Sequence, residues 1–475
     1  MKRKKKLKTK NFLVFIIIII LIITSIIYGI NKSKNNNTNS KEQNKIENKD
    51  KVNNTKKLTE LEKTLIIGID VGSQTHYARA FDWRNYEYSR KPFAFSNDES
   101  GFLAFQAWMD EIAEKHHKET VIPGMEPTGH YWFNLGAFLQ EQGMRVVHVN
   151  PHHVKKSKEL DDNNPNKNDR KDPKTIAALV NEGRFSYPYI PTGIYAEIRN
   201  LSNLRFQTQE AITRLKNRIA RWFSIYFPEY KDVYGKLDAV SGMMVLREAP
   251  LPEDIVALGV EGINQIWRNA KLRAVGLKRA RTLVNKAEHS VGSHEAPEAA
   301  RVELSLLLKD YEMYSQRMEE LMQTIEEKLR EIPYIDKLLE IKGIGMTTVC
   351  GFIAEVGDIR RFDNPKQLQK LAGYAIVSNN SGRHNGESHI SYRGRKRLRY
   401  VLYEAAISVI GKNAEFKEIH HYYRSREKNP LKKMQSVIAV ACKLIRIFYM
   451  IMTKGIDYDG AKMLGDIRRP TVPAA

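Results

Sequence analysis

Hydrophobic and polar residues between positions 65 and 149 follow patterns that alternate between strand and helix. Short apolar runs or two-residue alternation predict strands at 65–70, 76–81, 87–95, 120–125 and 145–149. Apolar residues spaced three or four apart predict helices at 102–112 and 131–142. Three strands followed by alternating helices and strands predict an α/β domain, and this order is typical of the ribonuclease-H-like fold.

The second half of the chain shows helical patterns almost throughout. A long helix is expected over 198–227, and from 304 onward hydrophobic residues repeat every seven positions. This repeat predicts a coiled-coil seam, which could pack on a neighbouring helix of the same chain or join two copies. Its members are Leu304, Tyr311, Met318, Ile325 and Ile332, with Leu308, Met322 and Leu329 at the intermediate positions.

Four acidic residues stand at the ends of predicted elements in the first half. Asp70 closes the first strand, Glu126 follows the fourth strand, and Asp169 and Asp172 lie just before a helix. Carboxylates brought together repel one another unless divalent cations lie between them, and such a cluster can hold two Mg²⁺ ions for phosphodiester transfer. Taken singly, each acid could instead be an ordinary turn or cap residue.

Basic and small residues gather in the C-terminal part. Lys342, Gly343 and Gly345 form a glycine turn before an apolar helix, an arrangement like the hairpin of helix-hairpin-helix modules, whose backbone amides can approach phosphate. Ser381 stands in a Ser-Gly pair, which could place a hydroxyl near a phosphate or simply form a turn. Candidate phosphate contacts, or a solvated basic helix start, are Arg383, Arg393, Arg395, Lys396, Arg397 and Arg399.

Charge separates the chain into regions with different expected partners. The formal net charge is +22. The first 57 residues contain 15 Lys or Arg and 3 acids, and residues 336–475 contain 25 and 13, so each region carries +12. A basic C-terminal region suits a polyanion such as nucleic acid. The two cysteines, Cys350 and Cys442, are too far apart in sequence to suggest a disulfide framework or a zinc pair, which fits a reducing cytosol.

The N-terminal segment has a different character from the rest. Residues 12–30 are 19 apolar residues after a basic cluster, long enough to cross a bilayer, and 31–57 are polar residues expected to form a disordered tether. Two interpretations remain open: a membrane anchor, or an appended start that is foreign to the folded part.

Taken together and in order, these motifs resemble the DEDD transposases of bacterial insertion sequences, the insertion sequence one-ten family. The resemblance covers nearly all of 61–460. It lies in Gly-Ile-Asp70-Val-Gly, Glu126-Pro-Thr-Gly-His-Tyr-Trp, Asn-Asp169-Arg-Lys-Asp172, Ile-Lys-Gly-Ile-Gly, Glu355-Val-Gly-Asp358, Leu371-Ala-Gly-Tyr, Ser381-Gly and Leu398-Arg-Tyr-Val-Leu. Two features depart from the family pattern: Pro173, where a small residue such as alanine is usual, and the apolar N-terminus.

The resemblance implies a specific chemistry for these residues. Asp70, Glu126, Asp169 and Asp172 would be catalytic and bind Mg²⁺ in a RuvC-like domain, and Ser381 would be the nucleophile of a C-terminal transposase domain. A phosphoserine-linked DNA intermediate, a circular excised element and a non-coding bridge RNA pairing with donor and target DNA are implied as well. So is a homo-oligomer, a dimer or tetramer joined by the coiled coil.

The expected organisation has five parts. They are a basic N-terminus with the transmembrane candidate and linker (1–60), a RuvC-like domain (61–215), a helical coiled-coil region (216–335), a mostly α-helical transposase domain with a helix-hairpin-helix-like motif (336–460) and a tail (461–475). The expected location is the cytoplasm, associated with the nucleoid, with a membrane tether through 12–30 as an option.

Three rival functions fit parts of the sequence. Gly-Ile-Asp70-Val-Gly-Ser also resembles the first phosphate loop of sugar kinases and actin-like ATPases, but the second Asp-x-Gly-Gly loop of that superfamily is missing from the sequence. A RuvC-like junction resolvase would use the metal without serine chemistry. A membrane-tethered nucleic-acid-binding protein would carry out no metal-dependent recombination.

Overall fold

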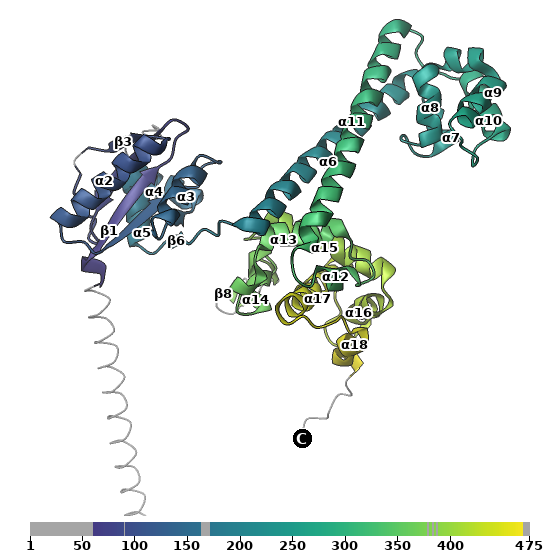
Figure 1. The fold of residues 1–475 in the computed structure, drawn as a ribbon. Coiled ribbons are helices and arrows are strands. Elements are labelled where there is room, and N and C mark those ends of the chain that lie inside the picture. Colours follow the sequence, from purple (N-terminus) through teal and green to yellow (C-terminus); the bar gives the residue numbers. More distant parts are fainter. Residues whose placement is uncertain are drawn as a thin grey trace, which may run out of the picture. The chain divides into compact units, whose positions relative to one another are not determined.

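The computed structural model describes residues 60–89, 91–162, 172–377, 380–381, 384–385 and 388–468 (Figure 1). The chain forms two compact units, Met1–Tyr189 and Ile190–Ala475. The predicted transmembrane segment and tether, 12–57, lie outside the described residues and stay predictions.

The first unit is built on one six-stranded sheet in the order β3-β2-β1-β4-β5-β6. The central strand β1 pairs antiparallel with β2 and parallel with β4, and β4 continues parallel with β5. This mixed sheet with its helices confirms the ribonuclease-H-like α/β prediction. The strands are β1 (Thr64–Asp70), β2 (Thr75–Phe81), β3 (Phe93–Ser96), β4 (Thr120–Met125), β5 (Val147–Val149) and β6 (Phe185–Ser186).

One predicted strand, 87–95, begins too early. Glu87 makes only an isolated bridge with Phe81, and regular pairing begins at β3. The reason is the turn after β2, where the buried carboxylate of Asp82 accepts hydrogen bonds from the backbone N–H groups of Arg84 and Tyr86. This turn brings Glu87 back to Arg79, which it binds in a two-pronged ion pair, so the chain reverses before β3 can start.

Helix α5 lies directly on the backbone of the central strands. A Cβ added to Gly68 of β1 would come within 1.8 Å of the carbonyl oxygen of Pro173, and one added to Gly124 of β4 would come within 2.5 Å of Val180 Cγ2. Only glycine permits so close an approach to the Pro173 carbonyl, so Gly68 fixes where α5 begins along β1. The helices of this unit are α2 (Glu99–Lys115), α3 (Trp132–Glu141), α4 (Pro151–Asp162) and α5 (Asp172–Asn181).

The second unit contains an arm of two long antiparallel helices, α6 (Gly193–Tyr226) and α11 (Pro297–Arg330), which lie side by side in Figure 1. At one end, Trp222 Nε1 donates a hydrogen bond of 3.0 Å to the carbonyl oxygen of Ala300. At the other end, Ile198 shares a core with Ile325. The predicted helix over 198–227 is therefore confirmed.

The seven-residue repeat falls on α11 and packs against α6 of the same chain. Leu304, Leu308, Ile325 and Leu329 are buried, whereas Tyr311, Met318 and Met322 near the middle of the arm remain partly exposed. Packing of α11 on α6 within one chain thus explains the hydrophobic residues at the two ends of the repeat. Association of two copies through it stays a prediction.

A small group of helices closes the far end of the arm, and we call it the distal module. It comprises α7 (Tyr230–Tyr234), α8 (Val240–Glu248), α9 (Pro252–Asn269) and α10 (Leu277–Glu288). Its core is separate from that of the C-terminal helices and includes Trp222, Phe227, Trp267, Leu283 and Leu304. The module is therefore an independent packing centre carried on the arm.

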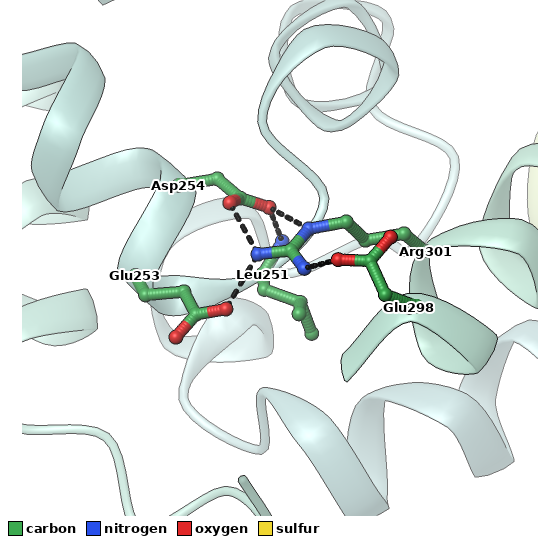
Figure 2. Close-up of polar contacts among 5 residues, drawn as sticks. All are labelled: Leu251, Glu253, Asp254, Glu298 and Arg301. Carbon is green, nitrogen blue, oxygen red and sulfur yellow. Dashed lines mark hydrogen bonds and ion pairs between the residues drawn. The ribbon is translucent and has the colours of Figure 1, made fainter. Parts of the chain in front are cut away.

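Arg301 of α11 fastens the distal module to the arm (Figure 2). Its guanidinium donates to both carboxylate oxygens of Asp254, at 3.0 and 2.7 Å, to Glu253 at 2.5 Å and to Glu298 at 2.8 Å. Asp254 also accepts a hydrogen bond from the backbone N–H of Leu251 and so caps α9. Burial acts to raise the pKa of Asp254, but the Arg301 and Leu251 hydrogen bonds outweigh it, and the net pKa lies below its usual value.

The C-terminal helices form the base of the arm around a large core in which Phe352 and Phe448 meet edge to face. Cys350 is buried and Cys442 half-buried there, as expected of small core residues. The elements are α12 (Ile335–Leu339), α13 (Met346–Val356), η1 (Ile359–Arg361), α14 (Pro365–Leu371), β7 (Ile376–Val377), β8 (Asn380–Ser381), β9 (His384–Asn385), β10 (His389–Ile390), α15 (Lys396–Lys412), α16 (Ala414–Ser425), α17 (Lys433–Lys454) and α18 (Gly460–Arg468).

Helix α17 is the one helix among the described residues that is long and apolar enough to cross a membrane. Half of its most apolar window is buried inside the protein, and its side chains belong to the C-terminal core. This burial accounts for its composition.

Two predicted domain boundaries fall inside helices. The boundary at 215–216 lies within α6, whereas the compact units divide after Tyr189, because α6 is continuous and packs with the second unit along its length. The predicted tail from 461 begins within α18, whose Met463 and Leu464 are buried in the C-terminal core.

Replacing Gly68 with alanine tests the seating of α5. The added methyl group would overlap the Pro173 carbonyl, so we expect the variant to lose about 1–3 kcal/mol or more of unfolding free energy. Gly411→Ala is the control, because nothing lies within 4 Å of a Cβ there and alanine suits a helix. Denaturant unfolding followed by circular dichroism measures both; equal stability of the two variants would refute the close contact.

The Arg301 site predicts a pH dependence. The pKa of Asp254 in the folded protein lies below its ordinary value of 3.8, so the ionised carboxylate stabilises the folded state at pH values above 3.8. This stabilisation is lost as the pH falls through the folded pKa. The melting temperature should therefore fall less on acidification from pH 5 to pH 3 in Arg301→Gln than in the wild type. Arg330→Gln, which breaks exposed pairs with Glu326 and Asp336, should leave the wild-type profile unchanged.

Candidate active site

Two of the predicted acids stand side by side at the carboxyl edge of the sheet. β1 and β4 are parallel with Ile69 opposite Met125, so Asp70 and Glu126 occupy the next facing positions on neighbouring strands. Both residues are half-buried. Parallel strands end at the same edge, and polar residues there can converge on one ligand.

The third acid, Asp172, reaches the same region through helix packing. It is the first residue of α5 and is buried, with only 7% of its surface exposed. The next residue, Pro173, lies on Gly68, two positions before Asp70. The ammonium of Lys158, from α4, forms an ion pair with Asp172. A buried carboxylate needs such a cation, since an unpaired buried charge is costly.

The described acids do not form a closed metal cage. Within the described ranges, no three His, Cys, Asp or Glu side chains come close enough to hold a metal ion. Asp169 lies outside the described residues. The donor set nevertheless suits a hard divalent cation, because carboxylate oxygens are the ligands that Mg²⁺ prefers. A metal ion at Asp172 would take the place that the Lys158 ammonium holds.

Backbone turns fix the two strand ends. After Asp70, the Gly72 N–H donates a 3.2 Å hydrogen bond to Nδ1 of the buried His76, which orders the turn into β2. After Glu126, the N–H of Thr128 donates back to the Glu126 carbonyl at 2.8 Å, and Gly129 follows with φ +56°. The two acids are thus held on short, constrained segments.

Two histidines of this unit, His76 and His148, lie in apolar surroundings. His76 lies between the rings of Phe95 and Phe102, and burial lowers its pKa. His148 of β5 meets Trp132 edge to face, and burial lowers its pKa to about 4. Both are therefore uncharged at neutral pH, and their packing explains them without a zinc site.

Ser381 lies in a β-hairpin of the second unit. β8 and β9 pair Ser381 with His384, and farther from the tip β7 and β10 pair Val377 with His389. Ser381 therefore stands next to the hairpin tip. Arg383 lies outside the described residues.

The basic run after the hairpin divides into structural and exposed members. Arg395 donates to the carbonyl oxygen of Glu355 at 2.7 Å, and Arg399 donates to those of Ala372 and Tyr392, both at 3.1 Å. These contacts hold the base of the hairpin.

The other three members of the run face outward to different degrees. Arg397 lies over the Phe206 ring of α6 at 4.9 Å and bonds Asn203, with its side chain still exposed. Arg393 and Lys396 are exposed and make no ion pair within the described part of the chain. They are the stronger candidates for phosphate contacts.

The glycine turn before α13 has a packing role. Gly343 has φ +103° and its Cβ position would lie 3.0 Å from Val409 Cα of α15, while its carbonyl accepts a 2.7 Å bond from Ser408 Oγ. Lys342 and Gly345 are exposed on the same turn. Packing therefore explains Gly343, and phosphate binding by this turn stays a prediction.

Lys158 is the residue of this region that sequence reasoning missed. It stands in the lysine-rich helix α4, where neighbouring lysines look alike in sequence. Only the folded position beside Asp172 distinguishes it.

Comparison with known proteins agrees with this architecture. A family model for DEDD transposases, described as "Transposase", matches residues 67–228, and one described as "Transposase IS116/IS110/IS902 family" matches 335–423. The Insertion element IS116 uncharacterized 44.8 kDa protein of Streptomyces clavuligerus is 24% identical over 392 residues, which are 81% of this chain and 94% of that protein. The Insertion element IS900 uncharacterized 42 kDa protein of Mycobacterium paratuberculosis is 22% identical over 409 residues, which are 83% and 97%.

The ribonuclease-H-like sheet with acids at its carboxyl edge, followed by a helical transposase region, defines a DNA transposase. The first family model matches the part of the chain with the sheet, and the second matches the C-terminal helices. The chain belongs to the IS110 family of DEDD transposases. DNA is accordingly a partner of this enzyme, and the expectation of a cytoplasmic, DNA-acting protein agrees with its relatives.

Asp70→Asn and Glu126→Gln test the metal edge. Each removes a carboxylate charge from neighbouring strand ends, so we expect Mn²⁺ affinity in calorimetry to fall at least about tenfold. Glu119→Gln is the matched control, because Glu119 precedes β4 at the opposite edge of the sheet. Unchanged Mn²⁺ binding in both test variants would rule out this edge as the metal site.

Proposed function

We propose that this transposase moves an insertion sequence by Mg²⁺-dependent strand cleavage and rejoining, with Ser381 as the nucleophile. The observation that carries the metal part is the parallel register that sets Asp70 and Glu126 on adjacent strand ends. Asp172, and Asp169 from the segment just before it, would complete the set. Support for the serine comes from the Ser381-Gly pair within the C-terminal transposase match.

The four acids would hold the metal, and their chemistry suits that task. When bound, divalent ions stabilise negative charge on a phosphate and on the departing oxygen. Lys158 balances the buried charge of Asp172 when no metal is there. Asp70 and Glu126 are half-buried at the carboxyl edge, where a bound divalent ion would link them to a DNA phosphate.

Ser381 would carry out the covalent step. Its Oγ forms a bond to phosphorus, the ester bond to the departing strand breaks, and the hydroxyl proton ends on the departing sugar oxygen. A serine hydroxyl is a weak nucleophile unless neighbouring groups stabilise the developing charge. Arg383, two positions after Ser381 in sequence, and the exposed Arg393 and Lys396 would bind the phosphate backbone beside it.

The proposed mechanism needs groups from both parts of the chain. The acids belong to the first unit and the serine to the second. We propose that they act on the same phosphate, with the serine supplied across subunits of a homo-oligomer. The partly exposed middle of the α11 seam is the proposed contact between copies.

The choice of DNA sites would come from a structured bridge RNA. The protein itself offers charged residues suited to backbone contacts, and such contacts fix position without reading sequence. A guide that pairs with donor and target DNA would supply the missing specificity. The RuvC-like nuclease without serine chemistry and the membrane-tethered binding protein are the alternatives.

Ser381→Ala separates the serine mechanism from metal-only cleavage. We expect strand exchange and the covalent protein–DNA product to fall below about one-thousandth of wild type, because no other hydroxyl replaces the nucleophile. Ser378→Ala, three residues earlier in the same motif, should retain both activities. Denaturing gels of end-labelled DNA show the covalent product; undiminished exchange by Ser381→Ala would refute the proposal.

A further inference from the structure

Positive charge concentrates on one side of the distal module. From Arg268 to Ala287 there are seven Lys or Arg and no Asp or Glu. The surrounding region, 58–335, is nearly balanced, with 37 basic and 39 acidic residues. The segment is therefore a local excess that the average charge of the region hides.

Three acids of the module bind residues of the arm. Asp254 and Glu253 bind Arg301 of the arm, as Figure 2 shows. Asp238 binds Lys216 of α6 at 2.7 Å and accepts a hydrogen bond from Tyr311 of α11 at 3.0 Å. These three acidic side chains thus attach the module to the arm, and among the described residues Lys286 is the one member of the basic segment with an ion pair.

Helix α10 presents the basic residues outward. Its buried side consists of Ala280, Leu283, Val284 and Ala287. Lys278 lies on the opposite side, and Arg281 and Lys286 flank it, because each residue advances 100° around the helix. Lys286 pairs with Asp232, whereas Lys278 and Arg281 are exposed and make no ion pair within the described structure.

The turn before α10 is rigidly built and adds two more charges. Arg268 donates to the carbonyl oxygens of Leu272 at 3.0 Å and Val275 at 2.5 Å, so its guanidinium ties the turn together. Lys271, at φ +58°, and Arg273 are exposed on this turn. Fixing the backbone in advance reduces the entropy lost when these side chains bind.

We propose that this surface, Lys271, Arg273, Lys278 and Arg281, binds the phosphate backbone of duplex DNA. The positive charge of this surface suits a nucleic acid, because basic side chains that neutralise phosphates release counterions, and this release favours binding. Duplex DNA fits better than single strands or unpaired RNA, which proteins grip by stacking bases on aromatic rings. Among described residues 230–288, no aromatic side chain is strongly exposed. The proposal rests on the enzyme's use of DNA and not on the serine or metal chemistry.

The arm sets where this contact falls. A helix of 34 residues, as α6 and α11 both are, is roughly 50 Å long. The distal module therefore lies far along the arm from the C-terminal core that carries Ser381. Backbone contacts there would hold DNA flanking the reaction site without reading its sequence.

The test compares two triple variants of the full chain in chelator, where no strand chemistry occurs. Lys271→Gln with Lys278→Gln and Arg281→Gln removes three charges from the surface. The control, Lys115→Gln with Arg145→Gln and Lys309→Gln, removes three exposed charges elsewhere. Melting curves establish that both variants fold, as exposed positions should allow.

Duplex affinity and its salt dependence give the result. We expect the test variant to bind a 60-base-pair duplex at least about tenfold more weakly than the control at about 0.15 M salt, with a slope of log affinity against log salt smaller by up to about 2.7. Equal affinities of the two variants would overturn the proposal. So would a loss confined to a structured RNA hairpin, with duplex binding unchanged.

A second measurement needs no variant. Lysine acylation of the wild-type protein, followed by mass spectrometry, should slow at least about threefold at Lys271 and Lys278 when duplex DNA is added, while Lys309 reacts as before. Equal reactivity with and without DNA at these two lysines would overturn the proposal even if the triple variant binds poorly.

Discussion

The backbone contact between α5 and Gly68 is the constraint on which the candidate metal site depends. Asp70 and Glu126 would be neighbours in any sheet with this strand order, but Asp172 comes from a helix more than 40 positions later. Its helix starts beside β1 because Pro173 rests on a residue with no side chain. Pro173, a departure from the family pattern, is accommodated because only its carbonyl has to meet β1 and the first turn of a helix tolerates proline.

Local patterns in the sequence determine most of the first unit. Apolar runs ending in acids located β1 and β4, and the period of three to four residues located α2 and α3 within a few residues. The strand at 87–95 was placed too early because the Asp82 turn depends on a buried carboxylate, and hydrophobic periodicity does not register it. Asp70 and Glu126 were identifiable because they stand at strand ends, which the sequence shows directly.

Partners in space were much harder to predict. The basic run from Arg393 to Arg399 looked uniform, yet Arg395 binds a carbonyl group 40 residues away and Arg399 one 27 residues away. No such bond to another described residue is seen for Arg393 or Lys396. Lys158 and the basic surface of the distal module could not be predicted for the same reason. Whether a basic side chain is paired depends on which acids lie near it in the folded protein. Gly343 looked like a phosphate turn, and its contact with α15 supplies a packing reason instead.

The arm has a further consequence for how such an enzyme could change. The chain enters the distal module near Trp222 and leaves it near Ala300, two residues joined by a hydrogen bond. The module is thus an insertion whose two ends adjoin, and its core is separate from that at the base. A short loop could join the two long helices in its place, so a lineage could gain, lose or exchange this part while the catalytic chemistry continues unaltered.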